Sequence, residues 1–74
     1  MPRTTMIATE IKYGGYVYHL NRPYRLSPMM DNKEIAGKLV YVKELMSQQG
    51  CDWLKVRLLN DTEYLVKPFF VIPA

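Results

Sequence analysis

The sequence holds one thiol and one imidazole, Cys51 and His19, and these are the first candidates for nucleophilic chemistry. A cysteine nucleophile needs a histidine in contact with it and usually a third group that orients the base. Cys51 lies between Gly50 and Asp52, a sequence typical of a turn, and the Asp52 carboxylate would disfavour the thiolate. We therefore expect no catalytic dyad, and we predict that His19 is a strand residue that faces water.

Phosphate and metal chemistry lack the residues they need. Gly37-Lys38 would belong to a phosphate-binding P-loop only with glycine at position 32 and serine or threonine at position 39, where the chain has Asn32 and Leu39. A zinc site needs three or four ligands at recognised spacing, and the sequence has none. The carboxylates follow no repeated spacing, and most have a basic neighbour: Glu10, Asp31, Glu34, Glu44, Asp52, Asp61 and Glu63. We expect no enzyme, no catalytic residue, no metal and no cofactor.

An aromatic and basic stretch lies in the first half of the chain. No acidic residue occurs between Glu10 and Asp31, whereas four of the six tyrosines and the only histidine do. Tyrosine rings stack on bases and Lys and Arg contact phosphates, but Tyr and Arg are also enriched in protein interfaces. In so small a protein several tyrosines must also pack in the core. The predicted binding surface comprises Lys12, Tyr16, Tyr18, His19, Arg22, Tyr24, Arg25 and Trp53.

Trp53 and the pair Met29-Met30 each have two interpretations. Trp53 opens a predicted strand and is expected to cap the core. The alternative is an aromatic cage for a cation, formed with Tyr18 or Tyr24. The two methionines are expected to fill the core, or else to form an adaptable apolar tip that docks on a partner.

Length and composition limit the remaining possibilities. The 74 residues suffice for a single domain, residues 1–74. A hydrophobic content of 49% with 23% charged residues argues against disorder. One cysteine makes no intramolecular disulfide, and no apolar run is long enough to span a membrane, so we expect a cytoplasmic protein. The net charge of +3 permits nucleic-acid binding without requiring it.

The first half of the chain predicts a hairpin followed by a long irregular segment. Residues 4–13 and 16–20 are compatible with strands, and Gly14-Gly15 suits a two-residue turn, because both positions need a positive φ. This register pairs Tyr13 with Tyr16, Ile11 with Tyr18 and Thr9 with Leu20. The rival interpretation has the two glycines in a loop that starts a strand at Tyr16. Residues 21–32 are expected to be a long excursion, because two prolines would block ladder bonding there.

Residues 31–50 fit two patterns. A helix over residues 32–49 would begin at an Asp31 cap closed by Glu34, with an apolar stripe of Ile35, Leu39, Val42 and Met46. A strand is favoured instead by the β-branched and aromatic residues 39–42 and by the helix-weakening Gly37 before them.

The last third of the chain is clearer. Residues 53–59 alternate, with Leu54, Val56 and Leu58 expected to face inward. Residues 60–62 form a predicted turn, and residues 63–67 return as the second strand of an antiparallel hairpin. Pro68 removes a donor from the ladder, and residues 69–72 are apolar enough to enter the core as a short last strand.

The order of these signals over residues 36–73 resembles the SH3-like small β-barrels, a group that includes KOW and Tudor modules. Residues 36–42 resemble the glycine-led second strand, residues 53–67 the central hairpin, and residues 67–73 the short helical turn with the closing strand. The predicted fold is therefore mainly β, a small SH3-like antiparallel barrel with an N-terminal strand or hairpin. The alternative is an α+β fold, ββαββ, with residues 32–49 helical. The resemblance implies a barrel whose loops and open strands bind protein or nucleic acid.

Size and surface together predict a binding protein. Burial in so short a chain barely offsets the entropy of ordering it, so we expect a larger protein partner or a homo-oligomer to contribute stability. The predicted function is a non-enzymatic protein-interaction module, either a small accessory subunit or a regulator. The alternative is a small regulatory protein that binds RNA or single-stranded DNA.

Overall fold

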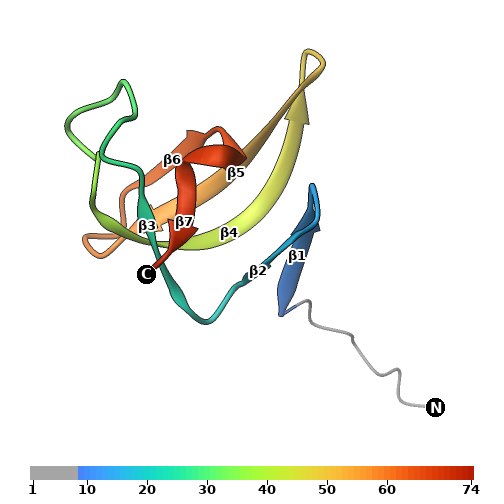
Figure 1. Cartoon of the computed structure of the whole chain (residues 1–74), viewed down its shortest axis with the longest axis horizontal. Coiled ribbons are helices and arrows are strands. Elements are labelled where there is room, and N and C mark those ends of the chain that lie inside the picture. Colours follow the sequence, from blue (N-terminus) through green and yellow to red (C-terminus); the bar gives the residue numbers. More distant parts are fainter. Residues whose placement is uncertain (1–8) are drawn as a thin grey trace.

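The computed structural model of the chain describes residues 9–74, which form two antiparallel sheets (Figure 1). The smaller sheet is the hairpin β1–β2, and the larger has the strand order β6-β5-β4-β3-β7. The elements are β1 (Glu10–Tyr13), β2 (Tyr16–His19), β3 (Pro23–Leu26), β4 (Leu39–Gln48), β5 (Cys51–Leu58), β6 (Glu63–Val66), the 3-10 helix η1 (Pro68–Phe70) and β7 (Val71–Pro73). Over these residues no helix is long and apolar enough to cross a membrane. The predicted mainly β fold with an N-terminal hairpin is confirmed.

The β1–β2 hairpin has the predicted register. Tyr13 pairs with Tyr16 and Ile11 with Tyr18, and the Leu20 N–H donates to the Thr9 carbonyl at 2.9 Å. Both turn glycines have positive φ values, 56° and 83°, which a residue with a Cβ adopts only with strain. The part of the predicted first strand at residues 4–8 lies outside the described residues.

The prediction of an irregular excursion over residues 21–32 is wrong in its first half. Residues 23–26 form β3, which pairs with β4 on one side and with β7 on the other. Proline is compatible with a strand at its first residue, and Pro23 occupies that position. Residues 27–38 then form the irregular segment, which is closed onto the sheet by a hydrogen bond from the Gly37 N–H to the Leu26 carbonyl.

The alternative helix over residues 32–49 is wrong, because residues 39–48 form the ten-residue strand β4. A β-bulge shifts the register between Val42 and Glu44, so that Val42 pairs with Val56 and Glu44 with Lys55. Bulges bend a strand and increase its twist, and β4 is strongly curved (Figure 1). The extra residue at the bulge keeps Val42 and Leu45 on one face, because Leu45 pairs with Leu54.

The predicted C-terminal hairpin is confirmed, with Leu54, Val56 and Leu58 buried on the inner face. Asp61 has a φ of 68° in the turn between β5 and β6. The predicted helical turn is η1, and β7 follows it as the last strand. Within residues 9–74 no ladder joins β6 to β7, so the larger sheet stays open, and the resemblance to the SH3-like barrels stays a prediction.

The core is formed by the larger sheet and by residues 27–38, with Tyr18 as its one buried member from the small sheet, and it is mostly aliphatic. The Tyr18 and Tyr24 rings close it at one end, with their centroids 5.7 Å apart. Its buried members are Tyr18, Tyr24, Leu26, Met30, Ile35, Val40, Val42, Leu54, Val56, Leu58, Val66 and Val71. No buried side-chain nitrogen or oxygen in the described part of the chain lacks a hydrogen-bond partner.

The tip of the small sheet is tied to the far end of the β4–β5 hairpin. The Tyr13 hydroxyl donates to one Asp52 carboxylate oxygen at 2.9 Å, and the Ser47 hydroxyl donates to the other at 2.6 Å. These two hydrogen bonds, with that of Ser47 the larger effect, hold the pKa of Asp52 below its ordinary value. The carboxylate in turn raises the pKa of Tyr13, since its phenolic proton is held in the hydrogen bond.

Truncation of the core should test this packing. Leu54→Ala removes a fully buried side chain and should lower the free energy of unfolding by about 2–5 kcal/mol. The control Leu59→Ala changes a leucine that is 69% exposed in the adjoining turn and should stay within about 0.5 kcal/mol of the wild type. Urea denaturation followed by circular dichroism measures both. Equal losses for the two variants would place Leu54 outside the core.

Because Asp52 ties the small sheet to the β4–β5 hairpin, the docking of the small sheet should weaken at low pH. A carboxyl group whose pKa is lowered on folding stabilises the folded state above its unfolded pKa, and this contribution is lost as the pH falls through the folded value. The wild type should therefore lose thermal stability relative to Asp52→Asn as the pH falls below about 4. Thermal melts between pH 2 and pH 7 test this. A constant difference between the two proteins across that range would show that the carboxylate charge has no part in docking.

Candidate functional site

The predicted binding surface separates into buried and exposed residues. Tyr18 and Tyr24 are only 5% and 6% exposed, so their rings are not free to stack on a ligand. The exposed members are Lys12, Tyr16, Arg22 and Arg25, while His19 and Trp53 are half-buried. Alternation along β2 puts Tyr16 and Tyr18 on the same face, so it does not explain the split. Tyr18 packs against Tyr24, whereas Tyr16 lies beside the Gly14-Gly15 turn.

Both buried tyrosines use their hydroxyls to hold the small sheet against the larger one. The Tyr18 hydroxyl donates to the Pro68 carbonyl at 3.2 Å. The Tyr24 hydroxyl accepts the His19 N–H at 2.7 Å and lies 3.5 Å from the Val17 carbonyl. Burial raises the pKa of Tyr18, so the hydroxyl stays protonated as a donor. These contacts place β2 beside η1 and β3.

An apolar groove lies between β2 and the C-terminal segment. Its rim carries exposed apolar side chains from both sides, and its floor is formed by the buried tyrosines and Val71. Tyr16 is 68% exposed and Phe69 is 72% exposed. The hollow has a volume of about 210 Å³ and is lined by Tyr16, Val17, Tyr18, Tyr24, Phe69, Val71, Ile72 and Pro73. This lining is hereafter the β2–β7 groove.

The groove continues into a hollow with a basic edge. The second hollow, about 270 Å³, shares Val17, Tyr24 and Pro73 with the β2–β7 groove. It adds His19 and Arg22 at its far end, hereafter called the basic end. Neither hollow is lined by an aspartate or glutamate. The combined surface is therefore apolar at one end and carries Arg22, His19 and the last residue, Ala74, at the other.

Sequence analysis missed the C-terminal half of this groove. The apolar run over residues 69–72 was expected to enter the core, and Val71 does so. The 3-10 helix turns Phe69 outward instead, where its ring lies 4.4 Å from that of Phe70. The resemblance over residues 67–73 implies such a turn, and Pro68 stands at its first position, where proline is favoured; the outward position of Phe69 is what the sequence analysis missed.

The other predicted binding residues lie elsewhere. The Lys67 ammonium sits 4.2 Å above the Trp53 ring, and the tyrosines proposed for an aromatic cage are buried against each other, so the cage is wrong. The Arg25 guanidinium donates to the Gly37 carbonyl at 2.9 Å. Met30 is buried, while Met29 is 80% exposed, so the methionine pair supplies one core residue and one surface residue.

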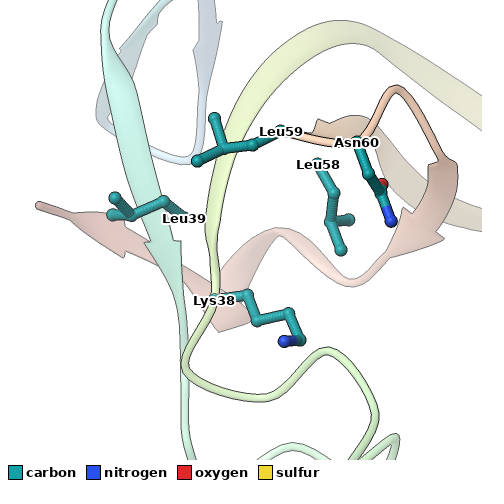
Figure 2. A pocket seen from close by; sticks show the side chains of 5 residues that line it. All are labelled: Lys38, Leu39, Leu58, Leu59 and Asn60. Atoms are coloured by element: carbon teal, nitrogen blue, oxygen red, sulfur yellow. The ribbon is translucent and has the colours of Figure 1, made fainter.

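A further hollow lies where β4 begins and β5 ends, and its lining has few reactive groups. Figure 2 shows Leu58 and Asn60 extending toward the side of Lys38, whereas Leu59 extends toward the side of Leu39. Its volume is about 340 Å³, and it holds one ammonium group and one amide. No carboxylate, imidazole or thiol lines it, and Lys38 is the one titratable side chain in its lining.

The chemically reactive side chains are dispersed. The Nδ1 atom of His19 lies 3.8 Å from the Glu10 carboxylate, while Cys51 is exposed at the start of β5 rather than inside the preceding turn. Within residues 9–74 no three His, Cys, Asp or Glu side chains are grouped so that they could hold a metal ion.

Comparison of the chain with protein family models, curated proteins and solved structures found no match.

The role of the Tyr24 hydroxyl can be tested separately from its ring. Tyr24→Phe keeps the buried ring but leaves the His19 N–H without its acceptor, which should lower the free energy of unfolding by about 1–3 kcal/mol. Tyr16→Phe is the matched control, because the Tyr16 ring is largely exposed. Chemical denaturation should show a loss for the first variant only. Equal stability of the two variants would mean that water replaces the Tyr24 hydroxyl at no cost.

Proposed function

We propose that this chain is a non-enzymatic protein-interaction module that binds a larger protein through the β2–β7 groove. The observation that carries the proposal is the pair of exposed aromatic side chains, Tyr16 and Phe69, on opposite rims of an apolar hollow. Monomeric proteins seldom leave a contiguous apolar patch exposed unless it binds something. The single cysteine is compatible with action in the cytoplasm.

The groove has the composition of an interface rather than of a solvated surface. Aromatic residues are enriched and charged residues are depleted at the centres of protein interfaces. The apolar lining of the groove is such a centre, and His19 and Arg22 provide a polar rim at one end. The floor is rigid, because the hydroxyls of Tyr18 and Tyr24 bond to backbone atoms. A rigid apolar hollow with aromatic edges suits the anchor side chain of a partner.

Nucleic-acid binding remains the second candidate, favoured by the outer face of the larger sheet. Strand alternation and pairing place five cations and two carboxylates on this face: Arg25, Lys43, Lys55, Arg57, Lys67, Glu44 and Glu63. The surplus of positive charge could contact phosphates. The Glu44 and Glu63 carboxylates already pair with Lys55 and Arg57, at 3.4 Å and 2.8 Å, and Lys67 covers Trp53. Binding of a single-stranded oligonucleotide that weakens steeply with salt would support this candidate.

Removal of both aromatic rims should abolish capture of the partner. The double variant Tyr16→Ala, Phe69→Ala should lose a protein that the wild type retains from a lysate of its source in stoichiometric amount. Both side chains are mostly exposed, so the variant should remain folded. Affinity capture with quantitative mass spectrometry measures the retained proteins, and circular dichroism checks the fold.

The matched control is Met29→Ala together with Leu59→Ala, two side chains that are 80% and 69% exposed outside the groove. This control should retain the partner at the wild-type level. Retention by the groove variant, or capture of no protein by the wild type, would overturn the proposed function.

A further inference from the structure

The β2–β7 groove offers a free backbone donor as well as apolar side chains. Tyr13 and Tyr16 flank a two-residue turn and therefore form a hydrogen-bonded pair. Because bonded and non-bonded pairs alternate in an antiparallel ladder, Lys12 and Val17 form a non-bonded pair, and the Val17 N–H points away from β1. The outward N–H and C=O of His19 agree with this alternation, since they bond to the Tyr24 hydroxyl and the Arg22 N–H.

The outward backbone groups of His19 are already hydrogen-bonded, whereas the Val17 N–H is free to bind a ligand. The Val17 carbonyl has only a long contact of 3.5 Å with the Tyr24 hydroxyl, and within residues 9–74 no hydrogen bond outside the strand ladders uses its N–H. On the opposite side of the groove, the Val71 N–H bonds to the Pro68 carbonyl, and Pro73 has no N–H. The groove therefore presents one donor for the main chain of a ligand and does not present a full strand edge.

Charge selects between the ligands that an apolar groove could take. The two connected hollows are lined by Arg22 and His19 and by no acidic residue. Lys12 lies beside Val17 on the neighbouring strand and is exposed, and Glu10 is the carboxylate on the same face, at 3.8 Å from His19. A ligand with carboxylates at the basic end would meet attraction from Arg22 and Lys12, whereas a cationic ligand would meet repulsion.

We propose that the β2–β7 groove binds an extended acidic peptide segment of a partner protein. A large apolar side chain of the segment lies between Tyr16 and Phe69, a backbone carbonyl accepts the Val17 N–H, and one or more carboxylates lie at Arg22. The three residue steps from Tyr16 to His19 span about 10 Å of strand, so the acidic residue lies two to four positions from the apolar one along the segment. This inference rests on the proposed function and adds the chemistry of the partner.

The test uses fluorescein-labelled eight-residue peptides with phenylalanine at the third position and aspartate at the fifth and sixth. Fluorescence anisotropy with the full chain measures the dissociation constant. Binding should weaken about fivefold or more when the aspartates become lysines, and also when the phenylalanine becomes alanine. On binding, exchange of the Val17 amide hydrogen should slow.

Protein variants locate the contacts. Arg22→Glu should weaken binding of the acidic peptide about fivefold or more. Lys33→Glu makes the same change in net charge on an exposed residue outside both hollows, and it should leave the affinity near the wild-type value. Phe69→Ala should weaken binding, while Met29→Ala should not.

Several outcomes would overturn the inference. They are equal losses for Arg22→Glu and Lys33→Glu, tighter binding of the lysine peptide or of an oligonucleotide, and a dimer in light scattering that the Phe69→Ala variant dissociates. Failure of the peptides, with the Tyr16- and Phe69-dependent partner still captured from lysate, would reject the acidic peptide and leave the proposed function standing. If capture of the partner did not depend on Tyr16 and Phe69, both the acidic peptide and the proposed function would be rejected.

Discussion

The contact between two buried tyrosines determines how the small sheet sits on the large one. The Tyr18 and Tyr24 rings pack at 5.7 Å, and each hydroxyl bonds to the backbone of a different element. A buried hydroxyl without a partner would be unfavourable, so these bonds favour one placement of β2 relative to η1 and β3. The groove exists because that placement leaves a gap which their side chains only partly fill.

The sequence was sufficient to predict the strands in which apolar and polar residues alternate and the strands that flank a glycine turn. Leu54, Val56 and Leu58 recur at every second position, and Gly14-Gly15 fixes the register of the first hairpin, because the turn length determines which residues face each other. The sequence does not indicate β3, because prolines within a segment argue against ladder pairing. Pro23 stands at the first residue of the strand, where a missing N–H is tolerated.

The binding surface was harder to predict because residue type does not determine exposure. Tyr16 and Tyr18 lie two residues apart on the same face of β2, yet the first is exposed and the second is buried. Only the extent to which the larger sheet covers this face of β2 decides which tyrosine is buried. The exposure of Phe69 was harder still to predict, since its outward position follows from a single turn of 3-10 helix. Apolar composition alone indicated burial, as it does for most such residues.

The bulge in β4 changes the curvature of the strand without changing which residues pair across to β5. The residues on either side of it, Val42 and Glu44, are paired with the consecutive residues Val56 and Lys55 of β5. Deletion of Lys43 would therefore leave each remaining cross-strand neighbour in place and remove the local bend. The long hairpin would then run straight past the small sheet, and the distance between Asp52 and the Tyr13 hydroxyl, now 2.9 Å, would grow. In this chain one additional residue encodes curvature, while pairing is encoded by the residues around it.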